Sequence, residues 1–201
     1  IHTTNANAVK TLPADKLPDD LKHYLKKDDR NKVIYHQKDE ELGPKLQMAI
    51  YDAFRIRDLM ENNGLSDLPE YRILVRMIGD QTTEEGELRD KKDIKPDSLQ
   101  NPNDPDATYR FKAGNHYHGY AGNVAQAYND DGASVIVSAD YEQNTYSDTK
   151  FMKDYIDAKE DTEKETMITD AAFQSAENDK AAAEAGIDHK ATSLTGKKVE
   201  R

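Results

Sequence analysis

Asp170 is the residue whose position best suits metal chemistry. It follows the short apolar segment 166–169 and precedes a helical pattern, so it stands where a strand is expected to end. Ligands in open α/β sheets gather at the carboxyl ends of strands, and a carboxylate there can bind a hard divalent cation such as Mg²⁺. The alternative interpretation of the same pattern is that Asp170 only ends the strand.

Two further acids, Asp104 and Asp106, stand on either side of Pro105, just before the first expected strand. Acids two positions apart on an extended chain point the same way. If their strand lies beside the strand that ends at Asp170, the carboxylates can share a metal. Two such metals about 4 Å apart clamp the attacking and leaving oxygens of a phosphoryl transfer. The alternative is a turn, which Asp-Pro sequences form routinely.

His116 and His118 are one strand spacing apart and could bind a metal from one face. Zinc sites need a third and a fourth ligand, and no matched partner motif is visible. The alternatives are a polar turn or contact with phosphate together with Arg110 and Lys112. The remaining basic residues expected in the same patch are Lys190, Lys197 and Lys198.

The elements that must position these residues fall into two parts. Residues 83–106 are rich in charge, Pro, Asn and Asp, which is typical of a loop. The sequence therefore predicts a helical subdomain at 1–82, a polar linker at 83–106 and a second domain at 107–201. Apolar residues at helical spacing predict helices over 18–27, over 44–62 with Pro44 at its start, and from Pro69 to about Gly79.

After Asp106 the apolar period changes to two, as in half-buried strands. The alternation of strands and helices toward the end predicts parallel strands with right-handed crossovers. A three-strand meander leading into parallel units is the order of a ribonuclease-H-like mixed sheet, so we predict an α/β fold. The expected strands are 107–112, 120–128, 134–141, 166–169 and 187–192, with helices following Ser147 and over 176–185.

Composition excludes several classes of protein. The 201 residues contain no Cys, which excludes a disulfide scaffold, a thiolate zinc site and a Cys nucleophile. No apolar run approaches the roughly 20 residues of a membrane span, so we expect no membrane partner. The absence of Cys fits a cytoplasmic protein, which is the location we expect. The net charge of −11 argues against nonspecific nucleic-acid binding, which needs clustered Lys and Arg.

Longer motifs resemble the central block of DDE-type transposases of bacterial insertion sequences. The similarity covers nearly the whole chain, and its motifs are long and occur in the family's order. The matching segments are 28–35, 81–82, 98–110, 112–114, 119–124, 143–148, 168–178 and 192–196.

This resemblance implies a ribonuclease-H-like catalytic domain in which three acids bind two Mg²⁺ ions. The metals activate water, and then the freed 3′-hydroxyl, for attack on DNA phosphodiesters. Asp170 matches the second acid, within a run that reads Asp-Ala-Ala-Phe where relatives commonly have Asp-Gly-Ala-Tyr. Asp104 or Asp106 could be the first acid, or it could belong to a strand upstream of Ile1.

The third acid of the family, a helical Glu, is expected beyond Arg201, because Glu177 and Glu184 come too early in the fold. We therefore expect a fragment of a transposase that is catalytically incomplete as this chain. DNA is the implied partner, contacted by the basic patch, and a homodimer is possible. Two alternatives stay open: a non-enzymatic α/β remnant or binding domain, and a metal-dependent nuclease that is complete in itself.

Overall fold

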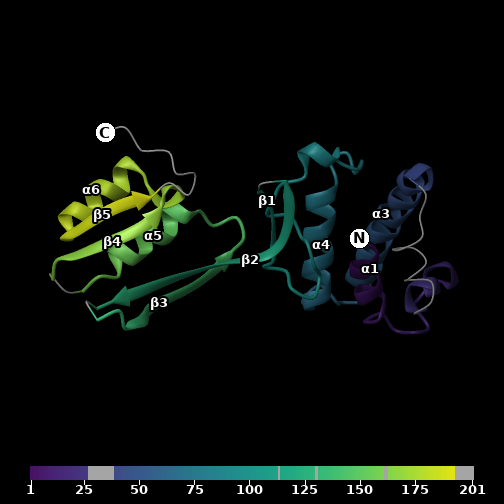
Figure 1. Cartoon of the computed structure of the whole chain (residues 1–201). Coiled ribbons are helices and arrows are strands. Elements are labelled where there is room, and N and C mark those ends of the chain that lie inside the picture. The colour runs from purple at the N-terminus through teal and green to yellow at the C-terminus, as the bar shows by residue number, and fades with distance from the viewer. Residues whose placement is uncertain (27–38, 113, 130, 161–162, 193–201) are drawn as a thin grey trace. The chain divides into compact units, whose positions relative to one another are not determined.

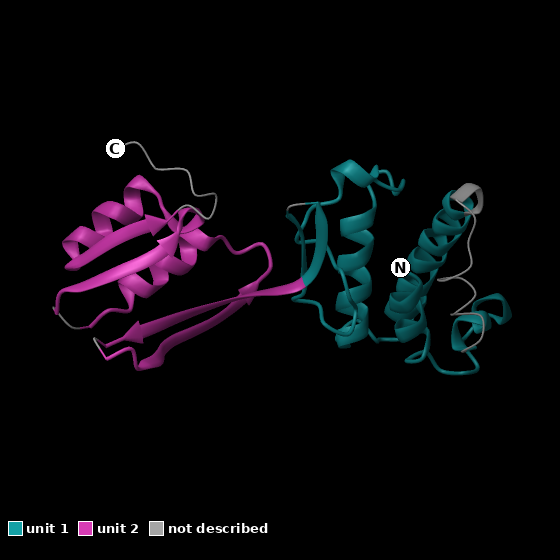
Figure 2. Cartoon of the chain, viewed as in Figure 1, with its two compact units in different colours: residues 1–118 teal, residues 119–201 magenta. Residues whose placement is uncertain are grey.

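The chain folds into two compact units, each with its own buried cluster of hydrophobic side chains. The computed structural model describes residues 1–26, 39–112, 114–129, 131–160 and 163–192 (Figure 1). Unit 1 comprises residues 1–118 and unit 2 residues 119–201 (Figure 2).

Unit 1 is mainly helical, as the sequence predicts. Its helices are α1 (His2–Val9), the 3₁₀ helix η1 (Asp19–Leu25), α3 (Asp39–Asn62), α4 (Pro69–Gln81) and the short 3₁₀ helix η2 (Lys91–Asp93). The helix expected from Pro69 is confirmed as α4, with the proline in its first turn, where the missing N–H costs nothing. The segment 18–27 forms a 3₁₀ rather than an α-helix.

The prediction for α3 is wrong at its start, which lies at Asp39 and leaves Pro44 inside the helix. Because proline has no N–H, the intrahelical hydrogen bond that residue 44 would donate is missing. The sequence did not predict α1 at all. Its residues, His-Thr-Thr-Asn-Ala-Asn-Ala-Val, carry no apolar stripe at helical spacing.

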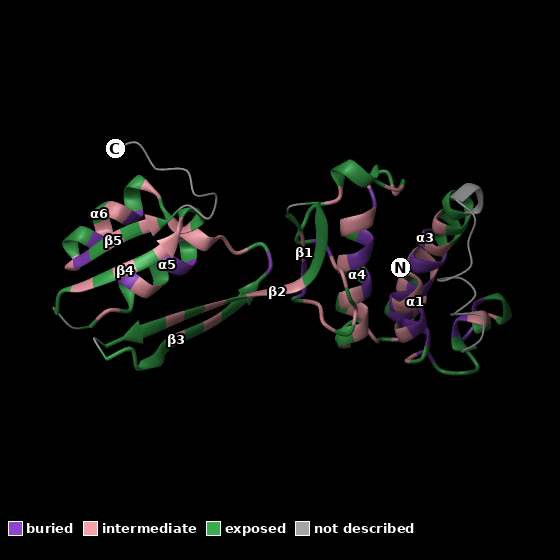
Figure 3. Cartoon of the chain, viewed as in Figure 1, coloured by how far each residue is buried: buried purple, intermediate pink, exposed green. Residues whose placement is uncertain are grey.

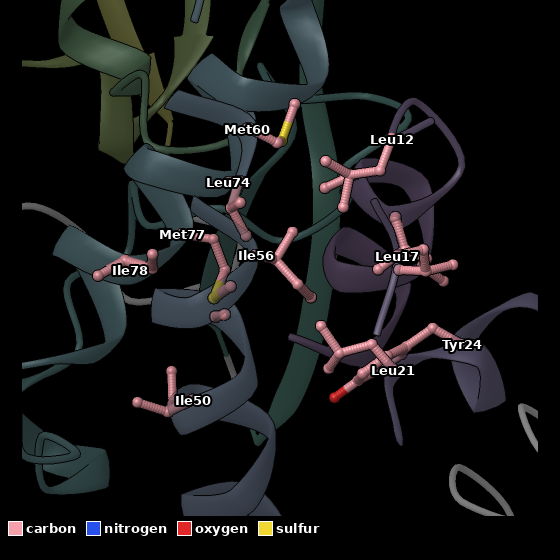
Figure 4. Close-up of a cluster of buried hydrophobic side chains, with 14 residues drawn as sticks. Leu12, Leu17, Leu21, Tyr24, Ile50, Ile56, Met60, Leu74, Met77 and Ile78 are labelled. Carbon is pink, nitrogen blue, oxygen red and sulfur yellow. The ribbon is translucent and has the colours of Figure 1, made fainter. Parts of the chain in front are cut away.

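The core of unit 1 lies between α1, α3 and α4 (Figures 3 and 4). On α3 the buried residues recur every three or four positions, which places them on one face of the helix. Their side chains pack against α4 and against the N-terminal segment. The core residues labelled in Figure 4 are Leu12, Leu17, Leu21, Tyr24, Ile50, Ile56, Met60, Leu74, Met77 and Ile78.

The expected linker 83–106 packs on unit 1 instead of separating two domains. Leu88 and Leu99 are partly buried against the helical core. The backbone N–H of Leu99 donates to Asp80 Oδ2 at 2.8 Å, and Arg76 Nη1 donates to the Pro105 carbonyl at 2.7 Å. Polar composition predicts a loop, but it does not reveal that side chains of α4 hold this loop. The division between the two units falls between residues 118 and 119.

The strands lie in two sheets. Strands β1 (Thr108–Lys112), β2 (Asn115–Tyr128) and β3 (Ser134–Gln143) form one sheet in that order, and β4 (Glu165–Asp170) pairs with β5 (Ile187–Thr192) in the other. The helices of unit 2 are α5 (Asp148–Asp157), η3 (Ala171–Phe173) and α6 (Ala176–Glu184). The coarse prediction of an α/β fold with a three-strand meander and a later parallel pair is confirmed.

The expected hairpin is present in unit 2. Strands β2 and β3 are antiparallel, from the pair Tyr120–Gln143 to the pair Tyr128–Ser134. Gly132 has φ of 82° in the turn, and Asn129 Oδ1 accepts a hydrogen bond from the Ala133 N–H at 2.8 Å.

Strands β4 and β5 are parallel, so the predicted crossover through α6 is also confirmed. Side chains from α5, α6 and both strands form the small core of unit 2. The buried members of this core are Met152, Ile156, Ala182 and Ile187.

The prediction of one mixed sheet is not met by the described residues. Strand β4 pairs with β5 alone, and no described strand joins it to the meander. Alternating sequence patterns specify strands, but not which edges meet, because pairing depends on contacts distant along the chain. Within the described residues, no helix combines the length and the apolar character that crossing a lipid bilayer requires.

Candidate functional site

Asp170 is the last residue of β4 and caps the 3₁₀ turn that follows. Its Oδ1 accepts a hydrogen bond from the Ala172 N–H at 2.6 Å. The side chain is partly exposed, and Asp170 faces Thr192 across the parallel pair. The structure therefore places this acid at the carboxyl end of a parallel strand, as the sequence predicts. In the part of the chain that is described, Oδ2 forms no hydrogen bond or ion pair.

A partly buried hydrogen-bond network lies beside Asp170. Thr169 Oγ1 lies 2.8 Å from His189 Nε2, and His189 Nδ1 lies 2.7 Å from Asp179 Oδ1. The His189 side chain is only 2% exposed. The Thr169 hydroxyl also contacts the Asp170 carbonyl oxygen at 3.0 Å. Because this hydrogen-bond network joins β4, β5 and α6, it holds the end of β4 in place.

The hydrogen bond from His189 lowers the pKa of Asp179, with a further contribution from Gln174 Nε2 at 3.0 Å. The acid is thus held as a carboxylate over a wider pH range than a free Asp. Sequence reasoning missed this network. Thr169, Asp179 and His189 carry no common motif, and only the parallel register of β4 and β5 brings them together.

A cavity of about 860 Å³ opens in unit 2 beside Asp170. It is lined by 123–128 of β2, 165–170 of β4 and apolar side chains of α5. The charged residues of this lining are Glu165 and Asp170, at opposite ends of β4. Five strand steps separate them by about 16 Å, which is too far for the two carboxylates to share one metal.

Asp104 and Asp106 are not brought together with Asp170 in one unit, because both belong to unit 1. The Asp104 N–H donates to the Asn101 carbonyl at 3.1 Å, and the Asp104 carbonyl accepts from the Ala107 N–H at 3.3 Å. Asp106 is exposed. Their backbone therefore forms the turn that was the alternative to a metal site.

No group of three or more His, Asp or Glu side chains is arranged to hold a metal ion among the residues that the structure describes. Among these described residues, the donor at the end of β4 is the Asp170 carboxylate. A single hard oxygen ligand fits part of a Mg²⁺ coordination shell, in which Mg²⁺ usually keeps several waters. It does not make the two-metal site that phosphoryl transfer needs.

The residues of the expected basic patch are distributed over both units. Lys190 lies on β5 in unit 2 and pairs with Asp188 at 3.0 Å, whereas Arg110 and Lys112 lie on β1. Lys197 and Lys198 lie outside the described residues.

The histidines of the patch lie with the aromatic residues of β1 instead. The ring of His116 contacts Tyr109 and Phe111, with centroids 5.8 and 5.0 Å apart. The ring of His118 lies 5.3 Å from Tyr109. Successive residues of a strand point to opposite faces, and residues two apart share one. Both histidines therefore share a face with Tyr109 and Phe111, and Arg110 and Lys112 point to the other face. Spacing along one strand could not show this, since it depends on how β1 pairs with β2.

Comparison of the chain with models of protein families, with curated proteins and with solved structures gives no match in any of the three.

Proposed function

We propose that this chain is part of the catalytic domain of a DDE-type transposase and that Asp170 is one of its metal-binding acids. The observation that carries the proposal is the partly exposed carboxylate at the carboxyl end of β4, beside its parallel neighbour β5. Its support from the fold is the order of elements in unit 2: an antiparallel hairpin, a helix, a strand, a helix and a parallel strand.

The surroundings of Asp170 suit a ligand of Mg²⁺. One carboxylate oxygen is oriented by the Ala172 N–H, while the side chain remains accessible. The partly buried network through Thr169 and His189 limits movement of the strand end. Mg²⁺ bound there would act as a Lewis acid on a phosphate oxygen. The role of the chain's own residues is to hold the carboxylate at a defined point.

This proposal includes catalytic incompleteness. One carboxylate can bind Mg²⁺ only weakly, and strand cleavage needs a second and a third acid. Asp104, Asp106, Arg110, Lys112, His116, His118 and Lys190 keep their proposed roles in metal or DNA contact only if the complete enzyme arranges them around its substrate. As isolated, the chain should bind Mg²⁺ in the millimolar range and leave DNA intact.

A metal titration tests the proposal. Mn²⁺ replaces Mg²⁺ as the probe, because free Mn²⁺ is measured directly by electron paramagnetic resonance. Asp170→Asn should weaken Mn²⁺ binding at least about tenfold, since loss of even an outer-shell partner costs about 10- to 100-fold. Glu165→Gln is the matched control, because Glu165 lines the same cavity at the far end of β4, and it should leave the affinity unchanged.

Two different results would contradict the proposal, and each favours a different alternative function. Equal Mn²⁺ affinity in the wild-type chain and Asp170→Asn would favour a non-enzymatic α/β binding or remnant domain. Cleavage of plasmid DNA by the purified chain with Mg²⁺ would instead show a nuclease that is complete in itself.

A further inference from the structure

His116 and His118 occupy alternate positions on β2 within unit 1, and both side chains are exposed. Two strand steps place their Cα atoms about 6.6 Å apart on one face. A metal–imidazole bond is about 2.0–2.1 Å long. Two imidazoles at this spacing can therefore reach one ion placed between them.

Contacts with β1 already hold both rings near one another. The two rings lie 5.8 and 5.3 Å from the same Tyr109 ring, and Phe111 packs against His116 at 5.0 Å. The rings are thus supported on a surface of aromatic side chains, which reduces the rotamer freedom that binding an ion would otherwise remove.

The hydrogen bonds leave the outer nitrogen of each ring available. His116 Nδ1 lies 2.6 Å from the Tyr109 hydroxyl, and His118 Nδ1 lies 3.3 Å from Gln100 Oε1. Among the described residues, neither Nε2 has a hydrogen-bond partner. Metal-binding histidines characteristically use one nitrogen for the metal while the other is held by an oxygen, which orients the ring and selects the tautomer.

We propose that His116 and His118 form a chelating site for one divalent late transition-metal ion, with water completing the coordination. Neutral imidazole suits Cu²⁺, Ni²⁺ and Zn²⁺, whereas Mg²⁺ prefers oxygen. The affinity order should be Cu²⁺ above Ni²⁺ and Zn²⁺. This site differs in ligand chemistry from the carboxylate at Asp170 and does not depend on the proposed function.

The test is a Cu²⁺ titration of the untagged chain, followed by electron paramagnetic resonance and by the ring C–H signals of the histidines. One equivalent should shift or broaden His116 and His118 together. Each of His116→Ala and His118→Ala should weaken this binding at least about tenfold, because a chelate loses one of its two protein ligands.

Two controls separate chelation from general histidine chemistry. His23→Ala removes a histidine of unit 1 whose Nδ1 is also engaged, by the Asp20 carbonyl at 2.6 Å, but which has no histidine two residues away. It should leave the affinity unchanged. Tyr109→Phe keeps the supporting ring and removes the hydroxyl at His116, so it should weaken binding while the fold, followed by circular dichroism, stays intact.

The proposal is overturned if Cu²⁺ affinity falls equally in His23→Ala and in either variant of the pair. It is also overturned if the first equivalent shifts the signals of only one of the two rings. If the alanine variants unfold, two measurements still test the proposal. These are the histidine signals of the wild-type chain during the titration and the Cu²⁺ affinity of Tyr109→Phe.

Discussion

The hydroxyl of Tyr24 joins two polar groups inside the core of unit 1. It accepts a hydrogen bond from Asn5 Nδ2 at 3.1 Å and donates one to Asp52 Oδ2 at 2.9 Å. Tyr24 is 3% exposed, and burial raises the pKa of its hydroxyl well above the ordinary value. The group therefore stays neutral and able to donate to the carboxylate.

Tyr24→Phe is expected to lower the free energy of unfolding by about 1–3 kcal/mol, because it leaves buried partners without their hydrogen bond. Urea denaturation measures the change. The matched control is Tyr71→Phe, whose hydroxyl donates to Glu61 Oε1 at 2.6 Å near the surface. A loss in the control as large as that in Tyr24→Phe would show that burial is not the cause.

Asp179 gives unit 2 a pH-dependent contribution to stability. The His189 hydrogen bond lowers its pKa in the folded state. A carboxyl of this kind contributes stability that is present above its unfolded pKa of about 3.9 and is lost as the pH falls through the lower folded value. Asp179→Asn should therefore reduce stability more at about pH 7 than at about pH 2.

Denaturation of the wild-type chain and Asp179→Asn across this pH range tests the sign of the effect. Asp188→Asn is the control, since Asp188 pairs with Lys190 on the surface of β5. If the difference in the free energy of unfolding between the wild-type chain and Asp179→Asn were the same at about pH 7 and about pH 2, the proposed pH-dependent contribution of Asp179 would be contradicted.

At the residue scale, the sequence predicts what depends on neighbours along the chain. Ser147 and Ser175 cap α5 and α6, and each accepts a hydrogen bond from the backbone N–H three residues later, at 3.2 and 3.1 Å. Asp170 is found at the expected strand end. The network of Thr169, Asp179 and His189 could not be predicted, because its members meet only after two strands pair and a helix crosses between them.

Two glycines of this protein are expected to respond in opposite ways to replacement by alanine. Gly132, in the turn between β2 and β3, has φ of 82°, whereas Gly79 lies inside α4 with an ordinary helical backbone. A Cβ built on either residue meets nothing within 4 Å. The backbone conformation is therefore the difference that decides the effect of adding a methyl group.

Gly132→Ala is expected to destabilise unit 2 by about 1 kcal/mol, because a side chain disfavours the left-handed region. Gly79→Ala should stabilise α4 by about 0.5–1 kcal/mol, since alanine loses less entropy in a helix. Thermal unfolding compares the two. Shifts of the same sign would refute the assignment of the effect to φ.

Elements with strong periodicity or clear turn residues are recovered from the sequence, as α4 and the hairpin of β2 and β3 show. Elements without a pattern are not: α1 has no apolar stripe. Which strands pair with each other is the hardest feature to predict from the sequence, because the sequence pattern of β4 predicts a strand whether or not it joins the meander. The structure shows that, among the described strands, β4 pairs with β5 alone.

For the whole molecule, two separate cores predict two separate unfolding events. Ile56 is fully buried in the core of unit 1, and Met152 is 2% exposed in the core of unit 2. Truncating either to Ala should cost about 2–5 kcal/mol in its own unit. Hydrogen exchange should show lost protection in one unit for each variant, and a loss spread evenly over residues 1–192 would contradict separate cores.

The net negative charge of the chain and the position of Asp170 at the end of β4 both lead us to expect weak binding of metal cations. A net charge of −11 favours cations over DNA phosphates in solution. Weak metal binding without DNA cleavage is therefore the behaviour expected of this chain, and the question is where on it the cation lies.

Paramagnetic mapping with Mn²⁺ answers that question most directly. Substoichiometric Mn²⁺ should broaden the amide signals at the end of β4 and in η3, around Asp170, and Asp170→Asn should abolish the broadening there. Broadening that is unchanged in Asp170→Asn, or that is confined to other acidic surfaces of the chain, would contradict the assignment of Asp170 as a metal-binding acid.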